Sequence, residues 1–190
     1  MQKLEQRKRL KLLLKRKHNL SVNIGLTGTP GTGKTTISKT LDCNLISIND
    51  YYPDISNVKD FEGNWLIDLE KLNEVIDVTQ YSNTIIEGHV AHFLSSLDLV
   101  VVLRCHPDKL TERLALRDYS EEKIRENVEA EALNIISDEA FELYKEGKVF
   151  ELDTTLSDLP KTINLFNGIM NGNIKSNKRL DYSETIMSWY

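Results

Sequence analysis

A stretch of eight residues near the start of the chain, GTPGTGKT at 28–35, has the spacing G-x-x-x-x-G-K-[ST]. Glycines at these positions let the backbone curl so that successive N–H groups point inward at an anion. We therefore expect a cradle for nucleotide phosphates, in which Lys34 reaches the β and γ phosphates and the Thr35 hydroxyl ligates Mg²⁺. The residues expected to contact ATP here are Gly28, Gly31, Thr32, Gly33, Lys34, Thr35 and Thr36.

A second stretch, TIIEGHVAH at 84–92, holds one acid, Glu87, and two histidines, His89 and His92. Alone, these residue types fit either a transition-metal site or part of a nucleotide site. A phosphate loop needs an acid at the end of a neighbouring strand, so we expect Glu87 to hold Mg²⁺ together with Thr35. His89 would orient or deprotonate a nucleophile, with a structural hydrogen bond as the alternative. His92 is expected to be structural.

Two arginines, Arg113 and Arg117, stand four residues apart in ERLALRDY and so share one helical face. Arginines that converge on a cleft stabilise the charge on a transferring phosphoryl group. The alternative for both is an exposed surface position. The predicted catalytic set is Lys34, Glu87, His89 and Arg117, and Arg113 is added to the nucleotide-binding residues.

The elements that would position these side chains alternate between strand and helix along the chain. Short apolar or β-branched runs predict strands at 22–27, 45–48, 84–87, 97–104 and 149–153. Helical spacing and capping residues predict helices at 34–41, 66–78, 107–117, 120–145 and 158–172. Alternation of this kind indicates an α/β fold with a mostly parallel sheet, whose ligands lie at the carboxyl ends of the strands. Those ends are Thr27, Asn49, Glu87, Arg104 and Asp153.

The bulk composition is that of an ordinary globular protein, with 190 residues, 40 % hydrophobic and 28 % charged. The length predicts one domain. The longest apolar run, at 97–103, is far shorter than the roughly 20 residues of a membrane span, so no membrane partner is expected. Two cysteines, Cys43 and Cys105, fit reduced thiols in a cytoplasmic protein.

Charge is distributed unevenly along the chain. Residues 1–17 carry eight basic side chains and one acidic side chain, whereas the rest holds 16 basic and 28 acidic residues. A basic arm at 1–20 is typical of contact with RNA or another polyanion, and a solvated terminus is the alternative. Its apolar stretch at 12–14 is too short for a secretory signal.

Three stretches together resemble the archaeal and eukaryotic adenylate-kinase-like family that includes adenylate kinase isoenzyme six, or CINAP. They are GTPGTGKTT at 28–36, IIEGHVAH at 85–92 and VVVLRCHPDKLTERLALRDYSEEKIRENVEAEAL at 100–133. The resemblance covers about 22–169. It implies a P-loop NTPase fold with a five-stranded parallel sheet and helices on both faces. It also implies a nucleoside-monophosphate-binding insert at about 49–72 and a lid at about 116–126. The chain is thus expected to consist of the arm at 1–20, which lies outside the resemblance, the domain at 21–172 and a tail at 173–190.

What the resemblance implies about function is more specific than the motifs alone. Family members have adenylate kinase and ATPase activity, and they act in maturation of the small ribosomal subunit by binding a platform ribosomal protein. The family's acid-x-His motif falls on Glu87 and His89, although the family usually has Asp at the first position. No arginine stands between 44 and 76 to bind an acceptor phosphate, which leaves Arg104 as a candidate substitute.

The sequence therefore predicts a Mg²⁺–ATP-dependent kinase for AMP or another nucleoside monophosphate, with ATPase activity. Its expected partners are a platform ribosomal protein and pre-ribosomal RNA, the latter through the arm. An ATPase assembly factor with little kinase activity is the alternative. A small-metabolite kinase of the shikimate or gluconate type is less favoured, because the insert lacks an arginine-rich acid-binding group. A GTPase is disfavoured because Asn-Lys-x-Asp does not occur.

Overall fold

The structure is a computed structural model that describes residues 22–56, 58–60, 63, 65–117, 119–156, 158–175, 178–187 and 189. The predicted basic arm at 1–20 lies outside these residues. Within them, no helix has the length and apolar character needed to cross a membrane.

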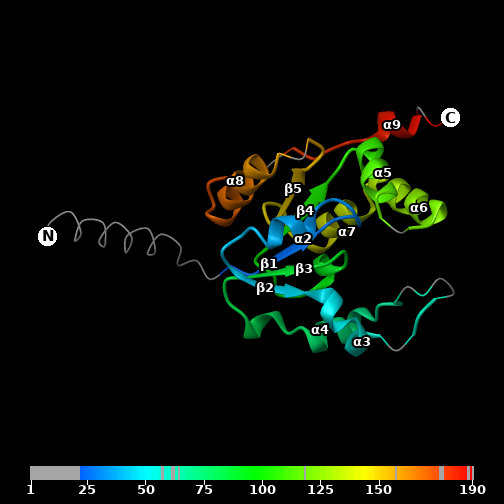
Figure 1. The fold of residues 1–190 in the computed structure, drawn as a ribbon. Helices are drawn as coiled ribbons and strands as arrows, with labels where there is room; N and C mark the ends of the chain where they lie inside the picture. The colour runs from blue at the N-terminus through cyan, green and yellow to red at the C-terminus, as the bar shows by residue number, and fades with distance from the viewer. Residues whose placement is uncertain are drawn as a thin grey trace, which may run out of the picture.

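One five-stranded sheet forms the centre of the molecule, and every neighbouring pair of strands is parallel (Figure 1). Its strands lie in the order β2-β3-β1-β4-β5. The strands are β1 (Ile24–Thr27), β2 (Asn44–Ser47), β3 (Thr84–Glu87), β4 (Leu99–Arg104) and β5 (Val149–Asp153). The expected α/β fold is confirmed, and the first strand lies between the third and fourth, where a parallel sheet places its ligand site.

Helices and short 3₁₀ turns connect the strands. The α-helices are α2 (Lys34–Ser38), α3 (Tyr52–Ile55), α4 (Leu69–Val75), α5 (Pro107–Ala115), α6 (Glu121–Ala132), α7 (Ile135–Leu143), α8 (Leu159–Met170) and α9 (Ser183–Met187). The 3₁₀ turns are η1 (Ile48–Tyr51), η2 (Val78–Gln80) and η3 (Ala91–Phe93). In Figure 1, α5 and α6 lie on one side of the strand ends, and α3 and α4 lie on the other.

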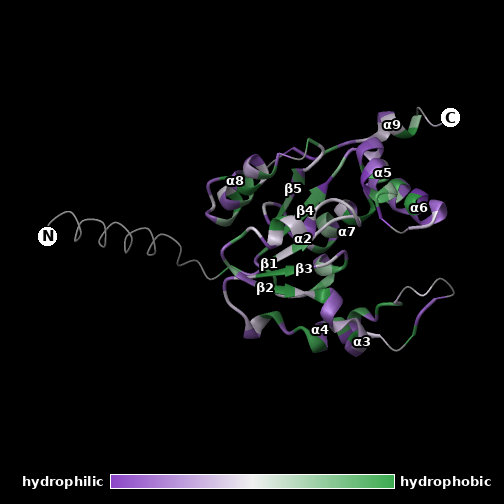
Figure 2. Ribbon diagram, viewed as in Figure 1, coloured by the Kyte–Doolittle hydropathy of each residue, from purple (hydrophilic) through white to green (hydrophobic). Residues whose placement is uncertain are grey.

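Consecutive strand residues point to opposite faces of the sheet. Both faces are buried, because helices pack against each of them. Along β4, Val100 and Val102 pack with α4, α7 and η3, while Val101 and Leu103 pack with α2 and α8. The strands accordingly form a hydrophobic centre between helices of mixed polarity (Figure 2). Covered on both faces, the sheet fixes the direction in which each strand end points.

One predicted helix is wrong. The pattern at 120–145 predicts a single helix, but the structure has two, α6 and α7, separated at Asn134, whose φ is 60°. Asparagine tolerates this left-handed conformation better than most residues. The Asn134 Oδ1 accepts a 2.5 Å hydrogen bond from the Arg104 guanidinium, so a tertiary contact accompanies the break. The predicted cap at the start of α6 is present, since the Ser120 hydroxyl accepts from the Lys123 N–H.

Candidate active site

The glycine-rich loop connects the end of β1 to the start of α2. Gly28, Gly31 and Gly33 have φ values of 133°, 95° and 104°, in a region that side chains rarely allow. At Gly28, a Cβ would also lie 2.4 Å from the Leu103 carbonyl oxygen of the neighbouring strand. The loop therefore takes its shape from backbone freedom and from close contact with β4.

The Lys34 side chain bends back across this loop. Its Nζ donates to the Gly28 carbonyl at 2.6 Å and to the Thr29 carbonyl at 3.1 Å. Burial lowers the pKa of Lys34 to about 8, although the charges of Glu87 and Glu131 act in the opposite direction. A cation inside the curl of the loop is placed to receive phosphate oxygens.

Glu87 ends β3 and lies beside the phosphate loop, because β3 pairs directly with β1. Both of its carboxylate oxygens lie 3.2 Å from the Thr35 hydroxyl. These oxygen atoms form a donor set that suits Mg²⁺. No group of three or more histidine, cysteine, aspartate or glutamate side chains with metal-binding geometry occurs in the part of the chain that the structure describes.

His89 lies two residues beyond Glu87 and lines the cleft. Its Nδ1 is 3.0 Å from the Tyr52 hydroxyl. Burial is the largest cause that lowers the pKa of His89 to about 4, and the nearby Lys34 charge adds to it. The ring is therefore neutral near pH 7, and Tyr52 fixes one of its two nitrogens. No motif in the sequence marks Tyr52, which lies in a polar stretch after β2.

His92 belongs to a different network from His89. Its Nδ1 is 3.0 Å from the Thr27 hydroxyl, and its Nε2 is 3.0 Å from a Glu139 carboxylate oxygen. Burial lowers the pKa of His92 to about 4 despite the carboxylate. The expectation of a structural role for His92 therefore agrees with its contacts, and the two histidines do not share a ligand site.

A cleft of about 1160 Å³ opens at the carboxyl ends of the strands. The phosphate loop, Glu87 and His89 form its floor. One wall comes from Asn49, Tyr52 and Trp65, and the other from Arg117 and the cleft side of α6. The α6 wall is lined by Ser120, Glu122, Lys123, Asn127 and Ala130.

The two arginines of the ERLALRDY stretch are not brought together. Arg117 lines the cleft and is exposed, whereas Arg113 does not line it. The Arg113 guanidinium donates to the Thr154 carbonyl at 2.5 Å and to the Thr154 hydroxyl at 3.2 Å. That hydroxyl donates in turn to the carbonyl of Thr32 in the phosphate loop, at 2.8 Å. Arg113 thus supports the loop from behind, and its expected place in the cleft is corrected.

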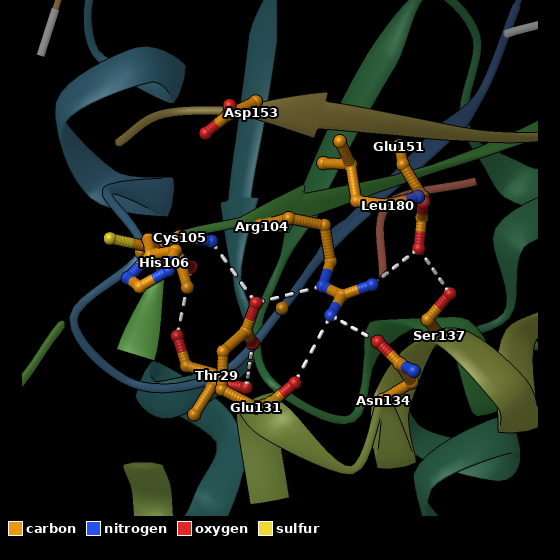
Figure 3. Close-up of polar contacts among 12 residues, drawn as sticks. Thr29, Arg104, Cys105, His106, Glu131, Asn134, Ser137, Glu151, Asp153 and Leu180 are labelled. Atoms are coloured by element: carbon orange, nitrogen blue, oxygen red, sulfur yellow. Dashed lines mark hydrogen bonds and ion pairs between the residues drawn. The ribbon is translucent and has the colours of Figure 1, made fainter. Parts of the chain in front are cut away.

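Arg104 cannot bind an acceptor phosphate, because it is 1 % exposed and paired with Glu131 and Glu151 (Figure 3). Sequence reasoning places it at a strand end, which is correct, but gives no sign that two buried carboxylates occupy its guanidinium. Glu131 and Glu151 lie in ordinary helical and strand patterns, so their partner is visible only in the folded chain.

The parallel strand order, the phosphate loop and the adjacent acid define a P-loop NTPase of the kinase type. A family model described as an AAA domain matches residues 24–134. A protein of Methanosarcina barkeri is 43 % identical over 153 residues, which cover 73 % of this chain and 80 % of that one. A Methanocaldococcus jannaschii protein is 39 % identical over 151 residues, 75 % of this chain and 82 % of that one. Both bear the name "Putative adenylate kinase". The chain belongs to this adenylate-kinase-like family of P-loop phosphotransferases.

Solved structures show the same fold at lower identity. Shikimate kinase from Acinetobacter baumannii, in complex with shikimate, gives a TM-score of 0.58 at 16 % identity, covering 84 % of this chain and 97 % of that one. Deoxyadenosine kinase from M. mycoides, with bound dATP, gives 0.50 at 18 % identity, covering 78 % of this chain and 98 % of that one. At such identities the likeness concerns the fold alone.

Proposed function

We propose that this protein transfers the γ-phosphoryl group of Mg²⁺–ATP to AMP or another nucleoside monophosphate, forming two nucleoside diphosphates. The observation that carries the proposal is the convergence of Lys34, Thr35 and Glu87 on the floor of one cleft. The cleft volume of about 1160 Å³ lies at or above the upper end of the ordinary range for one small ligand, roughly 300–1,000 Å³. That volume leaves room for a second nucleotide beside the donor.

The residues around the phosphate loop would act by position and charge, with little covalent chemistry of their own. Lys34 and the inward N–H groups of the loop would bind the β and γ phosphates. Thr35 and Glu87 would hold Mg²⁺, which when bound neutralises phosphate charge. Arg117, at the rim of the cleft, would contact the transferring group.

His89 would orient the attacking oxygen. The ring is neutral near pH 7 because its pKa is lowered to about 4. Tyr52 occupies Nδ1 at 3.0 Å, which leaves Nε2 as the nitrogen for a ligand. A neutral imidazole held at one nitrogen positions a nucleophile without repelling the Lys34 ammonium.

The acceptor would lie against the wall formed by Asn49, Tyr52 and Trp65, within the insert proposed at 49–72. The Lys59 ammonium lies 4.3 Å from the centre of the Trp65 ring. This pair offers an aromatic face and a positive charge on the side where an arginine is missing. The proposed lid at 116–126 would cover the opposite side with Arg117 and Lys123.

An ATPase that serves as an assembly factor is the second candidate. It is favoured by the lack of an arginine between 44 and 76, since water needs no phosphate clamp. In this version, the protein resembles CINAP and acts in the cytoplasm in maturation of the small ribosomal subunit. A platform ribosomal protein would be its partner, and the basic arm at 1–20 would contact pre-ribosomal RNA.

Product analysis with Mg²⁺–ATP, with and without AMP, tests the proposal. We expect two ADP per ATP consumed, formed only when AMP is present. Phosphate release that AMP does not change would contradict the proposed kinase activity and support the ATPase. A Glu87→Gln variant should lose either activity, whereas Glu87→Asp, which restores the usual acid of the family, should keep it.

A further inference from the structure

A buried ion cluster of Arg104, Glu131 and Glu151 lies next to Thr29 of the phosphate loop (Figure 3). These three residues do not line the cleft. Its centre is the Arg104 guanidinium, whose Nε donates to Glu131 at 2.7 Å and whose NH1 group donates to Glu151 at 2.5 Å. Glu131 and Glu151 are 2 % and 3 % exposed. Burial acts to lower the pKa of Arg104, but the two carboxylates outweigh it and raise that pKa.

The Glu131 carboxylate connects three separate parts of the fold. One oxygen accepts from Arg104 Nε and from the Cys105 N–H, both at the end of β4. The other accepts from the Thr29 hydroxyl at 2.5 Å. Glu131 itself belongs to α6. A single carboxylate therefore joins the phosphate loop, the end of β4 and α6.

Thr29 is central to the shape of the phosphate loop. Its carbonyl accepts from the Thr32 N–H at 3.2 Å, from the Thr32 hydroxyl at 2.8 Å and from Lys34 Nζ at 3.1 Å. The turn of the loop and the position of the Lys34 ammonium thus depend on where Thr29 lies. Because an ionised carboxylate only accepts hydrogen bonds, Glu131 fixes Thr29 through a charge-assisted bond.

The same helix that carries Glu131 forms a wall of the cleft. Lys123, Asn127 and Ala130 of α6 line the cleft, and Glu131 lies in the last turn of the helix. A helix transmits displacement along its axis as a nearly rigid rod. A shift of α6 toward a nucleotide would therefore move Glu131 and, through its hydrogen bond, Thr29.

We propose that Glu131 is a positioning residue that sets the phosphate loop through Thr29 and couples the loop to the α6 wall of the cleft. The inference rests on nucleotide binding at the loop, as proposed above. A buried ion pair by itself adds little net stability compared with apolar packing. The contribution of the cluster is therefore to fix the relative positions of the phosphate loop, the end of β4 and α6.

Variants of Thr29 test the link without breaking the ion pair. Thr29→Val keeps the shape of the side chain but removes the hydroxyl, and Thr29→Ser keeps the hydroxyl. We expect Thr29→Val to weaken Mg²⁺–ADP binding by about tenfold, measured by titration calorimetry on the full chain, because a hydrogen bond to a charged group is lost. Thr29→Ser should bind within about twofold of the unaltered chain. The melting temperature of both should change little.

Hydrogen exchange distinguishes coupling between the phosphate loop and α6 from an effect of Thr29 that is confined to the loop. Mg²⁺–ADP should protect the amides of both the loop and α6 in the unaltered chain, and α6 should lose that protection in Thr29→Val. Glu131→Gln should behave like Thr29→Val if it folds, while Glu129→Gln, at an exposed position on the same helix, should not.

Three results have distinct meanings. Equal binding by the unaltered chain and Thr29→Val would overturn the positioning role and leave the proposed function intact. Equal losses in Thr29→Ser and Thr29→Val would also overturn it, since the hydroxyl would not be the cause. An unaltered chain that does not bind Mg²⁺–ADP would overturn the proposed function, and the positioning role with it.

Discussion

Two polar groups beside the phosphate loop are buried and hydrogen-bonded, whereas two groups on the opposite side of the cleft face solvent. Thr29 and Glu87 are 2 % and 5 % exposed, and each has a hydrogen-bond partner. Across the cleft, Tyr119 is 39 % exposed and Arg117 is also exposed. The first side is supported by the sheet, and the second by short helices and connections.

The difference indicates how the two sides contribute to phosphoryl transfer. Groups that the core holds in place need no rearrangement when charge develops, which is the condition for electrostatic stabilisation. Groups on exposed segments gain their geometry when a ligand draws them in. We expect changes on the first side to remove activity outright and changes on the second to reduce the rate while leaving donor binding largely intact.

The largest expected effect comes from the centre of the buried side. Lys34→Met removes the ammonium that the Gly28 and Thr29 carbonyls hold in the loop. The rate of phosphoryl transfer should fall by about 10³-fold, the upper range for loss of one preorganised charge donor. Coupled-enzyme assays of ADP formation measure it. Lys39→Met, an exposed lysine just beyond α2, should leave the rate unchanged. A Lys34→Met rate within tenfold of normal would contradict the comparison.

The pH dependence of stability tests whether the His92 ring is buried in its neutral form. Its pKa is lowered to about 4 in the folded chain, against an ordinary 6.5. Between these pH values the unfolded chain binds more protons than the folded chain. The contribution of the neutral His92 ring to the free energy of unfolding is therefore fully present above pH 6.5 and is lost as pH falls toward 4. The loss should reach about 3 kcal/mol, because each pKa unit corresponds to roughly 1.4 kcal/mol.

Urea unfolding at several pH values measures this loss. His92→Asn should flatten the decrease between pH 6.5 and 4. An unchanged slope in His92→Asn would mean that folding does not lower the pKa of His92, and would contradict the prediction.

Arg113 of α5 and Arg117, just beyond its end, distinguish the two sides directly. Arg117→Ala should reduce kcat by about 100-fold with little change in melting temperature, since its side chain is exposed and lines the cleft. Arg113→Ala should instead lower the melting temperature, because it leaves the Thr154 carbonyl without that donor. The reverse pattern would show that Arg113 is the residue that contacts phosphate.

The smallest effect is expected where the two sides meet, at the contact between Tyr52 and His89. Tyr52→Phe removes the hydroxyl that lies 3.0 Å from His89 Nδ1, so the ring is no longer held at that nitrogen. We expect kcat to fall by about tenfold, because one hydrogen bond is lost, while KM for ATP stays unchanged. Tyr51→Phe is the matched control. An equal loss in both variants would point to packing of the two tyrosine rings rather than to the imidazole.

Local signals explain why much of the candidate site could be predicted. The loop at 28–35 depends on glycines and on a strand and helix next to it, all visible in the sequence. Glu87 follows from the end of a strand and from the need for an acid there. The predicted helix boundaries are less accurate. The helix expected from residue 66 begins at Leu69, because Asp68 caps it.

The errors and omissions share one property, which is dependence on contacts between distant residues. The sequence leaves Arg104 as a candidate for an acceptor phosphate, but Glu131 and Glu151, 27 and 47 residues away in sequence, neutralise it. Arg113 shares a helical face with Arg117, yet the loop after β5 binds its guanidinium. Periodicity gives the face of a helix but not what lies against it.

The sequence by itself determined the alternation of strands and helices, the phosphate loop and the acid at the end of β3. These depend on residue type and near-neighbour spacing. Only the tertiary structure decided that Tyr52 holds His89, that a break at Asn134 separates α6 from α7 and that Glu131 joins the loop to α6. Each of these needs a hydrogen bond between segments that only the folded sheet brings together, and a buried polar group takes whichever partner the packing supplies.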